Sequence, residues 1–186
     1  MTKLQLEKLL LKAGKLARER DFFLIGSQAL RGVSPAIPRD FPATREADLY
    51  PRRNPRAWNL LRTKLGKASV FFRRNGYYLD CTNPALSTLP EGWLERLIPF
   101  RTPRTRGVTA WCLEPHDLFV SKLVAWREKD QLYLAAMLRH KLAKAALVST
   151  RIGELPVSDS EKQELVKRLQ DLLDQKRRSL KKPKQH

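Results

Sequence analysis

The chain has 186 residues, a length that fits one domain or one domain with a small helical extension. Hydrophobic residues make up 42% of it, which excludes an intrinsically disordered chain, and no apolar run approaches the roughly 18 residues of a membrane span. The formal net charge of +18 favours a polyanionic partner, either nucleic acid or an anionic surface.

The first quarter of the chain predicts a helix and two strands. Leucines recur at helical spacing through residues 3–19, and the helix should end near Arg20 and Asp21. Residues 22–25 are continuously apolar, as in a strand covered on both faces, and Ser27 is placed to cap the helix that follows. Three prolines predict a loop over residues 33–43, and residues 46–50 form a second strand that ends at Pro51.

The middle of the chain mixes helical and strand signals. Residues 55–65 predict a helix that Gly66 stops. Segments 68–73 and 77–82 flank Asn75-Gly76, a strong short-range hairpin signal, so we expect two antiparallel strands there. Residues 84–103 contain four prolines and predict an irregular or short-helical insert, whereas residues 107–113 alternate and predict a last strand.

The last third of the chain is predicted to be helical. Pro115 and the acidic residues around it open a helix that should run from about residue 117 to 126, and a second helical segment covers residues 127–142. Ser158 precedes a final amphipathic helix, and the basic end from residue 176 to 186 should be frayed. The order of elements predicts an α/β fold, with a small mixed sheet in a core of residues 1–113, a helical C-terminal part over 114–178 and a basic tail over 179–186.

Two carboxylates two residues apart form the first part of a candidate site. Glu46 and Asp48 project from the same face of their strand, and such like charges are stable mainly when a cation lies between them. Paired oxygen ligands suit Mg²⁺, and the turn at Gly26 and Ser27 supplies backbone N–H groups for a phosphate. The alternative is a solvated acidic pair beside an ordinary capping turn.

A third carboxylate, Asp80, lies in the otherwise apolar segment 77–82. A charge in such a strand is seldom left without a partner. Asp80 therefore either forms a salt bridge with one of the many arginines or shares the cation and accepts a proton from an attacking hydroxyl.

Basic residues of the later helical region form the fourth element. Lys122 and Arg127 would neutralise charge that develops on a metal-bound triphosphate. In one regular helix Arg127 lies on a different face from Lys122, unless the helix breaks between them. The alternative is a solvated basic helix with Glu128 and Asp130 as local partners.

These four pieces, in this order, resemble the polymerase-β-type nucleotidyltransferase superfamily, and most closely the abortive-infection-type nucleotidyltransferase-like toxins of bacterial toxin–antitoxin systems. The resemblance covers about residues 20–142. The matching segments are Gly26-Ser27, Thr44-Arg45-Glu46-Ala47-Asp48, Asp80 and the helical stretch from Lys122 through Arg127 to Asp130.

The resemblance implies Mg²⁺-dependent transfer of a nucleoside monophosphate from an NTP to an acceptor. Glu46 and Asp48 would hold Mg²⁺, with Asp80 as third ligand or base, while Gly26, Ser27, Lys122 and Arg127 would bind the nucleotide. Glu46 stands where Asp is usual, and its longer side chain displaces the carboxylate by about one bond in a site that requires close placement.

The charge and the resemblance together predict an RNA acceptor, tRNA in particular, and the resemblance adds a toxin role with an antitoxin protein as partner. Arginines available for phosphate contacts begin directly after the acidic strand; they are Arg52, Arg53, Arg56, Arg62, Arg73 and Arg74. The alternative is a non-catalytic RNA- or DNA-binding module on a degenerate transferase fold.

The location predicted for the protein is the cytoplasm. Its two cysteines, Cys81 and Cys112, fit a reducing compartment better than a disulfide framework, and the N-terminus has no apolar signal core. No membrane partner is expected, because no apolar run is long enough to span a bilayer.

Overall fold

The computed structural model describes residues 1–34 and 36–181, and the chain divides into two compact units. The first unit comprises Met1–Ile37, Ala43–Ser87 and Leu94–Glu114, and the second comprises Pro38–Pro42, Thr88–Trp93 and Pro115–His186. The domain boundaries given above stay a prediction, because compactness alone does not show which segments fold independently.

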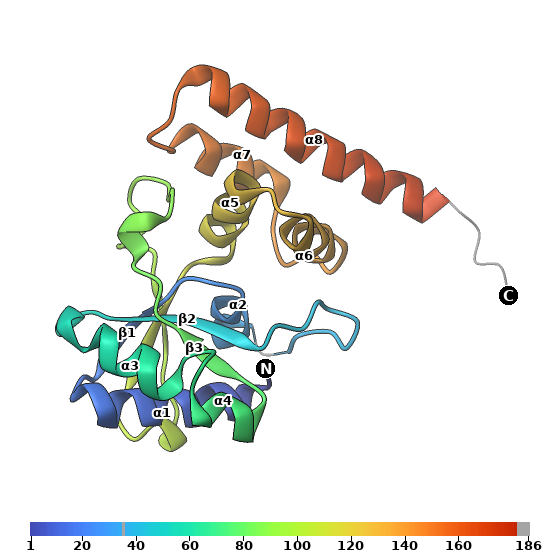
Figure 1. Cartoon of the computed structure of the whole chain (residues 1–186). Helices are drawn as coiled ribbons and strands as arrows, with labels where there is room; N and C mark the ends of the chain where they lie inside the picture. The colour runs from blue at the N-terminus through green and yellow to red at the C-terminus, as the bar shows by residue number, and fades with distance from the viewer. Residues whose placement is uncertain (35, 182–186) are drawn as a thin grey trace, which may run out of the picture. The chain divides into compact units, whose positions relative to one another are not determined.

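A five-stranded mixed sheet forms the centre of the first unit, as expected for the α/β class (Figure 1). Its strands are β1 (Asp21–Leu24), β2 (Glu46–Pro51), β3 (Tyr78–Asp80), β4 (Ile98–Phe100) and β5 (Thr109–Cys112). They are arranged in the order β3-β2-β1-β5-β4. The pairs β1–β5 and β2–β3 are parallel, whereas β1–β2 and β4–β5 are antiparallel.

The two faces of this sheet differ in burial. Side chains that alternate along the strands, including Phe22, Leu24, Ala47 and Leu49, are buried. The residues between them, such as Phe23, are only partly buried, so the strand predicted over residues 22–25 is covered more completely on one face than on the other. The half-buried face carries polar and aromatic side chains, because period-two alternation places Glu46 and Asp48 on it.

The described residues of the first unit form four α-helices beside the sheet: α1 (Lys3–Ala17), α2 (Gln28–Val33), α3 (Trp58–Leu65) and α4 (Val70–Asn75). A capping box between Thr2 and Gln5 starts α1, and α1 contacts both α2 and α3. Figure 1 shows α1, α3 and α4 on one side of the sheet. Gly14 of α1 is so close to Val108 that an added Cβ would lie 2.6 Å from a methyl carbon of that valine.

The hairpin predicted around Asn75-Gly76 is wrong. Residues 70–75 form α4, because Ser69 caps the helix by accepting a 3.1 Å hydrogen bond from the Phe72 N–H and Gly76 ends it at φ +74°. The chain therefore enters β3 after a helical crossover, and β3 runs parallel to β2. Of the two expected strands only the second exists, over Tyr78–Asp80.

The proline-rich segment 84–103 begins with a 3₁₀ turn, Pro84–Leu86, and its last residue opens a second, Pro103–Thr105, as the composition suggested, but it also holds β4, which was not expected. Its Pro99 lies in the edge strand of the sheet, where proline removes no essential ladder hydrogen bond. A third 3₁₀ turn, Pro55–Ala57, leads into α3.

A buried carboxylate fastens the loop ends of the first unit. Glu19 is 6% exposed, and its Oε1 accepts hydrogen bonds from the N–H groups of Arg20 and Asp21 at 2.7 and 3.0 Å. Its Oε2 accepts from the N–H groups of Arg53 and Asn54 at 2.8 and 3.0 Å. One side chain thus joins the start of β1 to the chain that leaves β2.

The second unit is helical within the part of the chain that the structure describes. It contains α5 (Pro115–Ala125), α6 (Glu128–Arg139), α7 (Ala145–Gly153) and α8 (Asp159–Lys181). Helix α8 contacts the other three, and α5 packs against α6 and α7. The sequence did not predict α7. Fraying from residue 176 is wrong as far as Lys181, which is still helical, and the rest of the basic tail lies outside the described residues.

None of the helices formed by the described residues is long and apolar enough to cross a membrane.

Candidate active site

Three carboxylates gather on the half-buried face of the sheet, and we call Glu46, Asp48 and Asp80 the acidic cluster. In the parallel pair β2–β3, Glu46 is in register with Tyr78 and Asp48 is in register with Asp80. Registered residues of neighbouring strands project from the same face, so all three carboxylates share one face. The helical crossover produces this alignment, because it makes the two strands parallel.

The Asp48 carboxylate lies directly against the turn that follows β1. A Cβ added to Gly26 would lie 1.5 Å from Oδ2 of Asp48, so no other residue fits at this position without moving the carboxylate. The backbones of the two segments are also in contact, since the Ile25 N–H donates to the Asp48 carbonyl at 3.2 Å. The hydroxyl of Thr82, which lies two residues after Asp80, is 3.5 Å from Oδ1 of Asp48.

Ser27 lies at the N-cap of α2, but its side chain makes no capping hydrogen bond, so its predicted capping role is wrong. Its backbone is helical, with φ −54° and ψ −27°, whereas a capping serine needs extended backbone to reach the N–H groups of the first turn. The Ala29 N–H instead donates to the Gly26 carbonyl at 2.8 Å. Binding of nucleotide phosphate by Gly26 and Ser27 stays a prediction.

Tyr78 belongs to this site and was missed by the sequence reasoning. Its hydroxyl donates a 2.7 Å hydrogen bond to Oε2 of Glu46. Burial, this hydrogen bond and the negative charges of Glu46, Asp80 and Asp48 raise the pKa of Tyr78 well above its usual value, so the hydroxyl stays a donor at neutral pH. The available signal was spacing, because Tyr78 lies two residues before Asp80 in a strand and therefore on its face.

The acidic cluster does not form a closed cage for a metal. Among the described residues no three His, Cys, Asp or Glu side chains are placed to hold one ion, and one oxygen of Glu46 is bound to Tyr78. Mg²⁺ commonly takes only one or two protein carboxylates and completes its shell with water and substrate phosphates. The donor chemistry thus fits an ion that arrives with a nucleotide, and Glu46, Asp48 and Asp80 as its ligands stay a prediction.

The two predicted basic residues lie in the second unit and share one partner. Lys122 donates to Oδ1 of Asp130 at 2.9 Å, and the Arg127 Nε donates to Oδ2 at 2.6 Å. The Lys122 and Asp130 side chains are 11% and 1% exposed, so the pair is buried rather than part of a solvated helix. The Lys122 ammonium also lies 4.7 Å from the centre of the Tyr133 ring.

A helix break brings Lys122 and Arg127 to the same carboxylate. Helix α5 ends at Ala125, Trp126 has φ +49°, and α6 starts at Glu128. Burial by itself would raise the pKa of Asp130, but the hydrogen bonds and charges of Arg127 and Lys122 outweigh it, and the pKa is lowered. A nucleotide-binding role for Lys122 and Arg127 stays a prediction.

The arginines that follow β2 lie at the opposite end of that strand from Glu46. Arg52 lies six positions after Glu46, a span of about 20 Å in extended chain. The Arg52 guanidinium stacks 4.9 Å from the ring centre of Phe23 and 5.1 Å from that of Trp111. Phosphate contacts by Arg52 and by the arginines that follow it stay a prediction.

Comparison with known proteins gives one finding. Residues 4–176 match a family described as "nucleotidyltransferase of unknown function" (DUF6036), and the match covers most of both units. No curated protein and no solved structure matches the chain. Together with an acidic cluster set against a Gly-Ser turn on a mixed sheet, this match shows that the chain belongs to that nucleotidyltransferase family.

Proposed function

We propose that the protein is an active nucleotidyltransferase that moves a nucleoside monophosphate from an NTP to an RNA acceptor, with the acidic cluster as its catalytic centre. The observation that carries this proposal is the placement of Asp48. Its carboxylate lies in the space that a side chain at position 26 would need, and it is in register with Asp80 on the neighbouring strand.

The side chains of the cluster suit different tasks. Tyr78 holds Glu46 through its hydroxyl and so reduces the freedom of the longer side chain that stands where Asp is usual. Asp80 is exposed and is the proposed acceptor of the proton from the attacking hydroxyl. Mg²⁺, when bound by these carboxylates together with the triphosphate, would offset the negative charge of the departing pyrophosphate.

The proposed acceptor is RNA, and tRNA in particular. The net charge of +18 supports a polyanionic acceptor, since each phosphate contact by Lys or Arg adds affinity that depends on salt. A toxin role with an antitoxin partner is the further proposal that follows from the resemblance. If it holds, expression of the wild type arrests growth of a bacterial host and expression of Asp48→Ala does not.

The direct test is transfer of α-labelled phosphate from each of the four NTPs to total tRNA in the presence of Mg²⁺. We expect Asp48→Ala to lose at least about 100-fold of the incorporation, the scale on which a misplaced reacting group lowers a rate. Asp171→Ala removes an exposed carboxylate of α8 and serves as the control of equal charge change. Equal incorporation by wild type and Asp48→Ala would remove the acidic cluster from the mechanism.

A second candidate function is a non-catalytic nucleic-acid-binding module. It is favoured by the hydrogen bond that occupies one Glu46 oxygen and by the lack, among the described residues, of a three-ligand metal group. Titration calorimetry with an NTP separates the two candidates. An enzyme binds NTP in a Mg²⁺-dependent way that Asp48→Ala abolishes, whereas the module shows no such binding and keeps its RNA affinity.

A further inference from the structure

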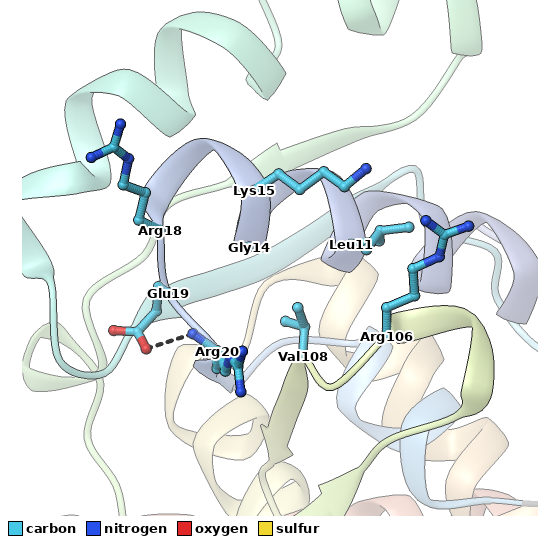
Figure 2. A pocket seen from close by; sticks show the side chains of 8 residues that line it. All are labelled: Leu11, Gly14, Lys15, Arg18, Glu19, Arg20, Arg106 and Val108. Carbon is cyan, nitrogen blue, oxygen red and sulfur yellow. Dashed lines mark hydrogen bonds between the residues drawn. The ribbon is translucent and has the colours of Figure 1, made fainter.

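A basic pocket in the first unit lies outside the acidic cluster. Its volume is about 320 Å³, at the lower end of the range for ligand sites. The floor is apolar and is formed by Leu11, Gly14 and Val108, where α1 packs against the chain that enters β5. Four basic side chains surround this floor, namely Lys15, Arg18, Arg20 and Arg106 (Figure 2).

The four basic side chains are exposed, and the described residues provide none of them with a carboxylate at ion-pair distance. Glu19 also lines the pocket, but its two oxygens accept four backbone N–H groups and its place is therefore fixed by the backbone. The lining thus has a formal charge of +3, four cations less one carboxylate. Unpaired cations around an apolar floor suit an anion rather than an internal ion pair.

The backbone at two of these arginines is unusual. Arg18 ends α1 at φ 50° and Arg106 ends the 3₁₀ turn Pro103–Thr105 at φ 48°, both in the left-handed region. Glycine is the usual residue at such helix ends, because a side chain there costs about 1 kcal/mol or more. Both arginine side chains therefore start from a helix end whose backbone direction is fixed.

The pocket and the acidic cluster lie at opposite ends of the central strand. Arg20 directly precedes β1, whereas Gly26 follows it six positions later, a span of about 20 Å in extended chain. The basic pocket can therefore be changed without touching the catalytic centre proposed above. Figure 2 shows the four basic side chains extending in different directions from its edge, which suits a chain of phosphates better than a single ion.

We propose that this basic pocket binds phosphate groups of an RNA strand at a distance from the reacting end. The inference deepens the proposed function, because it rests on RNA being the acceptor, and it adds a second, separate contact site. Lys15 and Arg106 are the best probes, since among the described residues neither side chain has an ion-pair partner and neither contributes to the hydrogen bonds of Glu19.

The experiment measures binding of a fluorescein-labelled single-stranded RNA by anisotropy across a series of salt concentrations. The variant Lys15→Gln/Arg106→Gln is compared with Lys64→Gln/Lys67→Gln. This control removes two exposed lysines, one in the last turn of α3 and one just after it, and so changes the net charge equally. We expect the slope of log K against log salt to fall by about 1.4 for the pocket variant, at about 0.7 per phosphate contact on a single strand. The control should keep the wild-type slope.

A single-residue variant tests whether a change in RNA binding reflects the pocket or a loss of folding. Arg106→Gly removes one charge and relieves the left-handed backbone, so its melting temperature should be equal to or above that of the wild type while its salt slope falls by about 0.7. A residue with a merely structural role would lower stability and leave the slope unchanged. Because RNA binding by the pocket variant and nucleotide transfer by Asp48→Ala are measured in different assays, failure of this pocket and failure of catalysis are separate results.

Three outcomes would overturn the inference. The first is that the wild type binds no RNA at low salt. The second is that the pocket and control variants lose equal affinity, which would mean that only overall charge matters. The third is loss of ATP binding in the pocket variant with RNA binding unchanged, which would identify the ligand as a free nucleotide.

Discussion

Gly26 has no side chain, and the Asp48 carboxylate occupies the space where one would lie. Tyr78 holds Glu46 in a comparable way, through a hydroxyl whose raised pKa keeps it protonated. Two neighbours therefore position the acidic cluster: Gly26 leaves room for the Asp48 carboxylate, and Tyr78 donates a hydrogen bond to Glu46. Both can be tested by a single substitution.

Gly26→Ala should displace the Asp48 carboxylate, since the added Cβ would lie 1.5 Å from Oδ2. We expect a loss of about 1–3 kcal/mol in the free energy of unfolding, measured by urea denaturation, and loss of Mg²⁺-dependent NTP binding. Gly153→Ala is the matched control, because a Cβ added at the end of α7 meets nothing within 4 Å. Unchanged NTP binding by Gly26→Ala would contradict the placement of Asp48 in the site.

Tyr78→Phe should change how stability depends on alkaline pH. The pKa of Tyr78 is raised on folding, so the neutral hydroxyl stabilises the protein fully below the unfolded value of 10.0, and this contribution is lost as pH rises beyond it. Tyr78→Phe should lower the free energy of unfolding by about 1 kcal/mol near pH 7. As pH rises above 10, the variant should lose less of its stability than the wild type does. Thermal melts across that range test this, and parallel curves for the two proteins would contradict it.

At the scale of elements, the end of a helix decides which side chains meet. Because α5 stops at Ala125 and Trp126 takes φ +49°, Lys122 and Arg127 reach the two oxygens of Asp130. Arg168 of α8 supports the same break, since its guanidinium donates to the Leu123 carbonyl at 3.1 Å and stacks on the Trp126 ring. The end of α5 is thus the point at which α5, α6 and α8 meet.

Asp130→Asn should destabilise the second unit, because it leaves the buried Lys122 ammonium without a counter-charge. We expect a loss of about 3–5 kcal/mol in the free energy of unfolding at pH 7, as for other broken buried pairs. The pKa of Asp130 is lowered on folding, so its contribution is present above the unfolded value of 3.8 and disappears as pH falls below it. The difference between the two proteins should therefore shrink in acid, and a constant difference from pH 7 to pH 3 would contradict this assignment.

At the scale of the whole molecule, contacts between distant segments position the site. Glu19 joins the start of β1 to the chain after β2 by four hydrogen bonds, two of them to residues 34 and 35 positions away. The neighbouring pair of β1 and β2 carries Gly26 and Asp48 at its other end. The hydrogen bonds of Glu19 at one end of β1 and β2 thus help to hold the register that places Asp48 against Gly26 at the other end.

Glu19→Gln should loosen this fastening. A glutamine has one acceptor oxygen in place of two, so two partly buried N–H groups lose their partner, and we expect a loss of about 1–3 kcal/mol in stability. Hydrogen exchange followed by NMR should show faster exchange at Arg53 and Asn54 than in the wild type. Glu95→Gln removes an exposed carboxylate as the control, and equal exchange in both variants would contradict the role of Glu19.

The amino-acid sequence by itself determined the elements with strong local periodicity, such as α1 and β2, and the pairing of Glu46 with Asp48 on one strand face. Those features depend on residues close together in the chain, so composition and spacing suffice to predict them. Only the tertiary structure decided that residues 70–75 are helical, that β3 therefore runs parallel to β2, and that Asp80 and Tyr78 lie beside Asp48 and Glu46. Strand pairing joins segments about thirty residues apart, and its register follows from packing and crossover geometry, which local sequence does not encode.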